Sequence, residues 1–376
     1  MPLKGFATPE GTGRFKKRFV ETHSRVPLHE GHFRERLGLW FSSIGLGSYL
    51  GEPDPATDAL YRESLKEAVR SGVNVIDSAI NYRCQRSERC FGLALSELAA
   101  AQEIQRDEII LCTKGGFIPF DGNHPSDPAG YFRKTYLETG LLLEGDVAQG
   151  CHAMTPRYLE DQLARSLENF GVETIDFYYV HNPETQRAEV DSKEFTKRLR
   201  AAFELLEKKV SEGKVRFYGT ATWNGYRVSP ESREHLSLED IHIVAREVGG
   251  VNHHFRAVQL PLNFAMPEAW VLRNQRYGAS HVPFLELARK LDLVVVASAS
   301  LLQGRLAGPL PAELRNLFPG FHQSSQCALQ FVRSCPGLTT ALVGMKSKAH
   351  VAENLETAQR APLSEDELAQ LFEKAV

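Results

Sequence analysis

Residues 73–100 read VNVIDSAINYRCQRSERCFGLALSELAA and contain one complete strand–loop–helix unit. The run 73–77 is apolar and β-branched, and it is long enough for a buried strand but too short for a helix. Ser87 is a good N-cap residue, and apolar side chains follow it at helical spacing over residues 87–101. The stretch therefore predicts a buried strand that a short polar loop connects to a helix.

The same unit recurs along the chain. Short apolar runs occur eight times, and segments with helical periodicity follow most of them. The predicted strands are 43–47, 73–77, 108–113, 175–180, 215–221, 256–260, 293–298 and 338–343. The predicted helices are 59–71, 87–101, 156–170, 193–212, 238–249, 281–291, 323–334 and 347–359.

Eight strand–helix alternations with continuously apolar strands predict a parallel sheet. Eight is also the number that closes a (β/α)8 barrel, so the predicted fold class is α/β, a single TIM barrel. A doubly wound open sheet is the alternative, and it is weakened because no G-x-G-x-x-G motif follows any of the eight runs. We expect the segment GLWFSSIG (38–45) to contribute to an N-terminal hairpin that closes the base of the barrel.

The chain divides into an N-terminal extension and one barrel domain. Residues 1–36 hold twice as many basic as acidic side chains, and we expect them to be a mobile or surface-wrapped extension. The barrel then occupies 37–376, with long loops at 115–155 after the third strand and 261–280 after the sixth. Both loops follow strand C-termini, where barrel enzymes build their active sites, so we expect 115–155 to act as a lid. The segment 362–376 begins with a capping-box pattern and predicts a last helix.

The composition excludes several functional classes. Lys+Arg 44 against Asp+Glu 47 argues against a dedicated nucleic-acid binder and against a polybasic membrane anchor. No apolar run is long enough to span a bilayer, and the N-terminus lacks the apolar core of a signal peptide. The six cysteines form no C-x-x-C pair, so we expect a reduced, cytoplasmic protein without a bound metal.

Four chemically active side chains lie where neighbouring strands are expected to end. The second strand ends at Asp77, with Tyr82 five residues later, the third ends at Lys114 and the fourth at His181. In a barrel these ends meet at one mouth. An ammonium stabilises a phenolate, a carboxylate keeps the ammonium charged, and a neutral imidazole can donate to a developing oxyanion. This arrangement favours carbonyl reduction, in which Tyr82 donates the proton and a nicotinamide supplies the hydride.

The motifs around these residues resemble those of the aldo-keto reductases. GLGSYLGEPD, VIDSAINY, SERCFG, LCTKGG and YVHNP are similar to the family's successive motifs, and the resemblance covers residues 38–360. It implies that Asp77, Tyr82, Lys114 and His181 form a catalytic tetrad with Tyr82 as the general acid. It also implies NADP-dependent reduction of a small aldehyde or ketone, or the reverse oxidation of an alcohol.

The resemblance further implies an extended NADP(H) site across the barrel mouth. Gln259 would hold the carboxamide, and the segment ASASLLQGRL would fold over the pyrophosphate. Lys346 and His350 would supply charge to the adenosine 2′-phosphate, just before a helix N-terminus, while the adjoining helix would face the adenine. The expected cofactor-binding residues are Gly47, Ser48, Tyr49, Asp77, Thr222, Gln259, Ser298, Leu301, Gln303, Gly304, Lys346, Ser347, His350, Glu353 and Asn354.

The carbonyl pocket is expected to be aromatic. Tyr49, Phe117 and Trp223 lie just past strand ends and could line it together with Tyr82, although core packing is the competing explanation for each.

The chain departs from the family pattern at three places. Many relatives carry Tyr at the position of Ser298, and Ser-Asn or Ser-Arg at Ala221–Thr222, so these changes bear on nicotinamide affinity. Gly is more usual than Arg83 after the tyrosine. Arg83 and Arg86 could add positive potential near the mouth or could face solvent.

Three other interpretations compete with a reductase. Lys114 could form a Schiff base as in class I aldolases, but a neighbouring Asp77 would keep it charged. The pair His253–His254 could suggest a metal site, but adjacent side chains point apart, so we interpret it as a loop with solvent-facing imidazoles. A third alternative is a cofactor-sensing binding subunit with little turnover, as in the β subunits of voltage-gated potassium channels.

Overall fold

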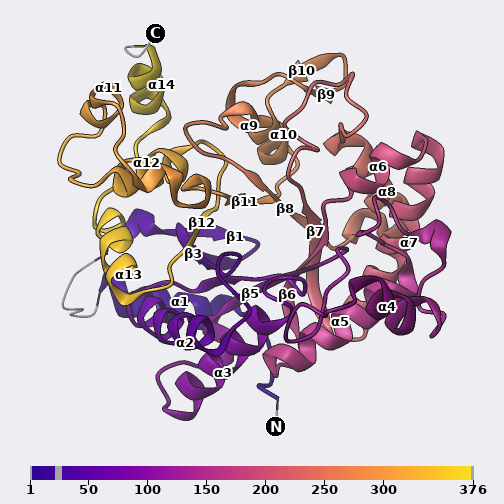
Figure 1. Cartoon of the computed structure of the whole chain (residues 1–376). Helices are drawn as coiled ribbons and strands as arrows, with labels where there is room; N and C mark the ends of the chain where they lie inside the picture. Colours follow the sequence, from indigo (N-terminus) through magenta and orange to yellow (C-terminus); the bar gives the residue numbers. More distant parts are fainter. Residues whose placement is uncertain (1, 22–27, 374–376) are drawn as a thin grey trace.

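The computed structural model describes residues 2–21 and 28–373. Eight parallel strands close into a barrel in the order β11-β12-β3-β4-β5-β6-β7-β8, which confirms the single (β/α)8 barrel (Figure 1). All eight predicted strands are present within two residues of the expected ends. The barrel strands are β3 (Ile44–Gly47), β4 (Val75–Asp77), β5 (Ile110–Gly115), β6 (Ile175–His181), β7 (Val215–Ala221), β8 (Phe255–Pro261), β11 (Val294–Ser298) and β12 (Thr340–Gly344).

Helices surround the barrel, and the local sequence explains their ends. Asp54 caps the helix that starts at Pro55, and Gly171 ends another helix with a φ of 63°, a conformation that favours glycine. The main helices that follow the barrel strands are α2 (Pro55–Arg70), α3 (Arg86–Ala100), α5 (Pro156–Phe170), α7 (Ser192–Ser211), α8 (Leu238–Gly249), α10 (Phe284–Lys290), α12 (Ser324–Ser334) and α13 (Lys348–Leu355). Smaller or terminal helices are α1 (Pro9–Val20), α4 (Pro128–Phe132), α6 (Glu184–Glu189), α9 (Glu268–Val271), α11 (Ala312–Asn316) and α14 (Glu365–Glu373).

The expected N-terminal hairpin is present. Strands β1 (Phe33–Arg36) and β2 (Leu39–Ser42) pair antiparallel across Leu37 and Gly38, which both have positive φ, as a two-residue hairpin turn requires. The Phe41 ring lies 5.8 Å from the Phe177 ring inside the barrel, so the hairpin closes its N-terminal end.

Residues 2–21 and 28–36 pack against the barrel rather than standing apart from it. Helix α1 buries Phe15 and Phe19, which belong to the same apolar cluster as the barrel strands and helices. Strand β1 pairs with β2 across the expected boundary, so a division between residues 36 and 37 would cut the hairpin. Spacing of four residues places the two phenylalanines on one face of a helix, and this face is what packs inward.

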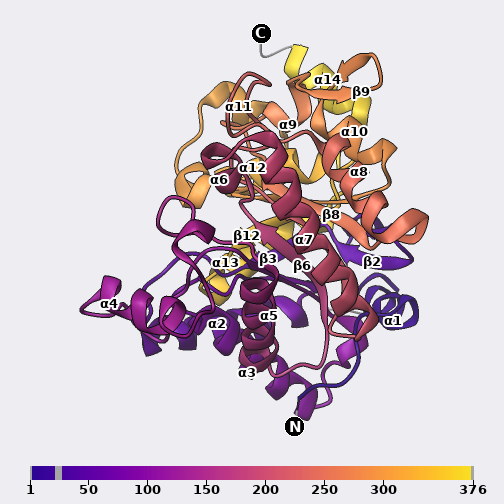
Figure 2. The same cartoon turned by 90° about the vertical axis from the view of Figure 1, so that its right-hand side faces the viewer.

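The loop 115–155, which is called the lid below after its expected role, is folded and has a small core of its own. It contains α4 and the π-helical segment η3 (Arg133–Leu137), and α4 projects from the barrel wall (Figure 2). Tyr136 and Leu142 pack with Tyr158 of α5. The Tyr136 hydroxyl donates to the carbonyl of Pro119 at 2.8 Å. These contacts attach the lid to α5.

The second long loop differs from the expectation. It contains α9 and a hairpin of β9 (Gln275–Tyr277) and β10 (Ser280–Val282), and α10 begins at Phe284 rather than at residue 281. Pro283 explains the shift, because the residue before a proline disfavours helical backbone angles.

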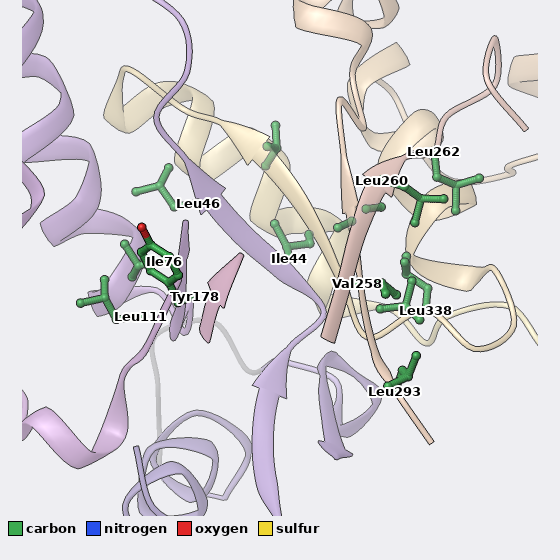
Figure 3. Packing of buried hydrophobic residues seen from close by; sticks show 14 of the residues in the cluster. Ile44, Leu46, Ile76, Leu111, Tyr178, Val258, Leu260, Leu262, Leu293 and Leu338 are labelled. Carbon is green, nitrogen blue, oxygen red and sulfur yellow. The ribbon is translucent and has the colours of Figure 1, made fainter. Parts of the chain in front are cut away.

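Strand parity divides the apolar residues into two layers. Leu46, Ile76, Leu111 and Tyr178 pack in the layer between strands and helices (Figure 3). Their neighbours along each strand point into the barrel, because successive side chains alternate across a strand. Within the described residues, no helix combines the length and apolar character needed to cross a bilayer.

Candidate active site

The four predicted tetrad residues continue the inward-facing rows of their strands. Val75, Cys112 and Tyr179 lie in the interior cluster of the barrel. Two residues further along β4, β5 and β6, the inward positions are Asp77, Lys114 and His181, and on β8 the same step leads from Ala257 to Gln259. The interior therefore changes from apolar to polar at the C-terminal end of the strands.

A buried ion pair forms the floor of the site. Lys114 Nζ lies 2.5 Å from Asp77 Oδ1 and donates to the carbonyl oxygen of Ser78 at 2.6 Å. Gln259 Nε2 donates to the other Asp77 oxygen at 2.9 Å. Burial disfavours the ammonium, but the adjacent carboxylate outweighs this effect, and the pKa of Lys114 lies above its ordinary value. Lys114 is therefore charged at neutral pH.

Tyr82 lies above this pair. Lys114 Nζ is 5.1 Å from the centre of the Tyr82 ring, and the His181 ring centre is 5.9 Å away. Burial raises the pKa of Tyr82, and Lys114 opposes that shift by stabilising the phenolate. Burial and the Lys114 charge hold the pKa of His181 well below its usual value, so this imidazole is neutral.

The lid reaches the imidazole from the other side. The Phe117 ring stands perpendicular to the His181 ring with their centres 5.0 Å apart. His152 Nε2 lies 2.6 Å from the carbonyl oxygen of His181, and Gln186 Nε2 donates to the carbonyl oxygen of His152 at 2.9 Å. The lid therefore helps to fix the backbone that carries His181.

The turn after the tyrosine has an unusual backbone. Residues 83–85 have consecutive φ values of 50°, 55° and 69°, and none is glycine. Left-handed backbone costs L-residues roughly 1–2 kcal/mol each, so surrounding contacts must hold it. Two come from the lid: the Cys84 carbonyl accepts from the Gly122 amide at 2.9 Å, and Gln85 Nε2 donates to the Phe120 carbonyl at 3.0 Å.

A cavity of about 590 Å³ opens above these groups, within the size range of small-molecule sites. It extends from the aromatic residues near the lid to Lys346 and His350 beyond β12. Of the residues that the sequence analysis assigned to catalysis, cofactor or substrate, those that line it are Gly47, Ser48, Tyr49, Asp77, Tyr82, Phe117, His181, Thr222, Trp223, Gln259, Ser298, Leu301, Gln303, Gly304, Lys346 and His350.

Comparison with known proteins identifies the family. The family model described as the Aldo/keto reductase family matches residues 43–246, which is more than half of the chain. The chain belongs to the aldo/keto reductase family. This confirms the resemblance that the motifs carried.

Individual members of the aldo/keto reductase family are distant. The chain is similar to the NADH-specific methylglyoxal reductase of Escherichia coli, at 25% identity over 229 residues, which is 60% of each protein. It is 24% identical over 331 residues to the 6-dehydroglucose reductase of Novosphingobium aromaticivorans, covering 85% of this chain and 87% of that protein. The match to prostaglandin F synthase 1 of Bos taurus spans only 35% of that protein.

A solved structure shows the same fold. The aldo/keto reductase from Klebsiella pneumoniae in complex with NADP and acetate superposes with a TM-score of 0.59 at 20% identity. The superposition covers 89% of this chain and 92% of the other.

Three residues expected at the adenosine end do not line the cavity. Ser347 caps α13 by accepting from the His350 amide at 3.2 Å, and Glu353 accepts a hydrogen bond from Ser325 of α12. Asn354 is buried. Glu353 does not reach the cavity because it lies on the face of α13 that packs on α12.

The sequence analysis also missed part of the cavity wall. Asn81 and Asn182 flank the tetrad residues, and Glu184 organises the loop that carries Trp223. Its Oε1 accepts from the backbone amides of Trp223 and Asn224 at 2.6 and 3.0 Å, while burial raises the pKa of Glu184 to about 7. Asn182 and Glu184 lie within YVHNPE, directly after the tetrad histidine, which is the signal that could have found them. The other missed lining residues are Leu50, Ala299, Ser300, Leu342, Val343 and Gly344.

The two histidines at 253–254 are structural. His254 Nδ1 lies 2.7 Å from a Glu207 carboxylate oxygen. His253 is buried with its ring centre 5.0 Å from that of His242, so the expectation of a solvent-facing imidazole is wrong there. In the described part of the chain, no group of three or more His, Cys, Asp or Glu is placed to hold a metal ion.

Proposed function

We propose that this protein reduces an aldehyde or ketone to an alcohol with NADPH, or runs the reverse oxidation, with Tyr82 as the general acid. The observation that carries the proposal is the Asp77–Lys114 ion pair beneath Tyr82 and a neutral His181, at the floor of a cavity of about 590 Å³. The proposed reaction requires only this one group of charged and hydrogen-bonding side chains.

Each side chain has a separate task. Because burial raises its pKa, Tyr82 holds its proton at neutral pH and can donate it to the carbonyl oxygen as hydride reaches the carbonyl carbon. The phenolate left behind is stabilised by the Lys114 ammonium, which Asp77 holds in place. The neutral His181 imidazole can donate a hydrogen bond to the same oxygen. A proton from solvent then restores the phenol.

The cavity offers groups that fit a nicotinamide cofactor, which would supply the hydride. Thr222 Oγ1 is buried in the cavity wall without a hydrogen-bond partner, and a carboxamide could satisfy it. The Gln259 nitrogen donates to Asp77, so its oxygen is the atom that can accept from the carboxamide.

The other end of the cavity supports NADPH over NADH. Lys346 and His350 line it beside the N-terminus of α13, where positive charge and free amides favour a phosphate. The cofactor named for the Escherichia coli relative is NADH, so the choice must be tested on this chain.

The test is a titration with NADPH and NADH, followed by turnover on a panel of aldehydes and ketones. We expect tight NADPH binding and many turnovers, and a Tyr82→Phe protein that binds NADPH normally but reduces carbonyls at least about 100-fold more slowly. Unchanged turnover in Tyr82→Phe would refute the assignment. Tight NADPH binding without turnover would favour the cofactor-sensing subunit instead. The two relatives named above as reductases do not support that alternative.

The proposed partner is a small-molecule carbonyl compound. We also propose a reducing compartment such as the cytoplasm, because all six cysteines are free thiols and five of them are buried.

A further inference from the structure

Arg83 connects the tyrosine turn to a neighbouring loop. Its guanidinium is almost fully buried, with 1% of the side chain exposed. Nε donates to the carbonyl of Glu52 at 2.8 Å, and Nη2 donates to the carbonyl of Asp54 at 3.2 Å and to Asp58 Oδ1 at 2.5 Å. The sequence analysis expected Arg83 to face the mouth or solvent, and the structure shows that it does neither.

The loop to which Arg83 donates these hydrogen bonds forms part of the cavity wall. Residues 48–54 carry Tyr49, whose ring lies 5.1 Å from the Tyr82 ring in an edge-to-face contact. The Tyr61 hydroxyl donates to the carbonyl of Leu50 in the same loop at 2.7 Å, and the Arg83 guanidinium lies 5.4 Å from the Tyr61 ring. One guanidinium therefore joins the tyrosine turn, the loop 48–54 and helix α2.

We propose that Arg83 is a positioning residue, which holds the left-handed turn after Tyr82 against the loop 48–54 and so fixes the phenol over Lys114. The inference rests on the proposed reductase function. Consecutive left-handed residues persist only where surrounding contacts determine them, and the lid contacts hold Cys84 and Gln85 but not Arg83. The buried guanidinium supplies the missing restraint on the residue next to the phenol.

This role is geometric rather than electrostatic. Burial shifts the pKa of Tyr82 most, followed by the Lys114 ammonium and the Asp77 carboxylate. Loss of Arg83 should therefore lower kcat without moving the pH profile of the reaction. A displacement of about 1 Å in a catalytic group can cost about 100-fold in rate.

Arg86 provides a matched control. It pairs with the second oxygen of the same Asp58 carboxylate at 2.5 Å and donates to the carbonyl of Gly122 in the lid at 3.4 Å, whereas its hydrogen bonds do not reach the loop 48–54. We expect Arg83→Gln to lose about tenfold to 100-fold in kcat, with the kinetic pKa unchanged. We expect Arg86→Gln, which removes an equal charge from the same partner, to stay within about twofold of the wild type.

A second variant separates positioning from folding. Arg83→Gly suits the positive φ of this position, so it retains the backbone while it removes the guanidinium. Added methylguanidinium, which can occupy the vacated site, should restore part of its kcat and should not affect Arg86→Gly. Equal kcat in Arg83→Gln and Arg86→Gln, a shifted pH profile, or the absence of rescue would overturn the inference. A wild-type protein that reduces no carbonyl would instead refute the proposed function itself, and this inference with it.

Discussion

Replacing Lys114 by Met removes the charge beneath the phenol and tests the proposed chemistry most directly. The ammonium lies 5.1 Å from the Tyr82 ring centre, which at an effective dielectric constant near 20 corresponds to about 3 kcal/mol of phenolate stabilisation. If the proton is largely transferred in the transition state, kcat should fall about 200-fold. Single-turnover reduction of a carbonyl at saturating NADPH measures this rate, and cofactor fluorescence measures binding separately.

The variant also leaves a buried carboxylate without its partner, and this effect must be separated from the loss of chemistry. An unpaired Asp77 should destabilise the fold by about 3–5 kcal/mol, measured by urea unfolding. The double variant Asp77→Asn/Lys114→Met removes both charges, so it should recover stability but not rate. Arg106→Met breaks another buried ion pair, with Asp176, outside the cavity and should leave kcat unchanged. Recovery of kcat in the double variant would refute the electrostatic role of Lys114.

Three further predictions concern the cofactor, the pH response and the barrel wall. Lys346→Met should weaken NADPH binding about tenfold, the value of a charged hydrogen bond, and leave NADH binding unchanged; equal losses for both cofactors would exclude a 2′-phosphate contact. Burial lowers the pKa of His32 from 6.5 to about 3, so only the unfolded chain takes up this proton as the pH falls from 7 to 5. That uptake costs about 2 kcal/mol of stability, and His32→Gln should abolish this part of the loss in urea unfolding at the two pH values. A Cβ on Gly219 would overlap a carbonyl oxygen of β8, so Gly219→Ala should lose about 1–3 kcal/mol, whereas Gly145→Ala, with open space around it, should melt like the wild type.

The sequence predicts the barrel and the tetrad for one shared reason. Parallel strands are buried on both faces, so each one is a short apolar run that differs visibly from the helices. The chemistry begins where such a run ends in a polar residue, as at Asp77, Lys114 and His181. Side chains alternate along each strand, so every second residue faces the inside of the barrel. On β8 the residue two positions after the inward-facing Ala257 is Gln259.

The contacts that the sequence does not reveal are those between segments far apart in the chain. Arg83 is exposed or buried according to where the loop 48–54 lies, and local spacing carries no information on that distance. Glu353 turns away from the cavity because α12 packs beside it, and His253 is covered by His242. In each case a polar side chain that would suit solvent in isolation finds a specific partner in the folded chain.

The site combines rigid and adjustable parts, and this division has a chemical consequence. Lys114 and Asp77 lie on hydrogen-bonded strands, so the electrostatics of the proposed proton transfer do not depend on loop conformation. Tyr82 lies on a loop, and Phe117 lies on the lid, so their positions depend on contacts such as those of Arg83 and Gln85. Changes in the lid can therefore alter which carbonyl compound fits without altering the ion pair that stabilises the phenolate. The restraint on Tyr82 links the two parts. In the proposed reaction the same phenol must contact the substrate and remain over the ammonium.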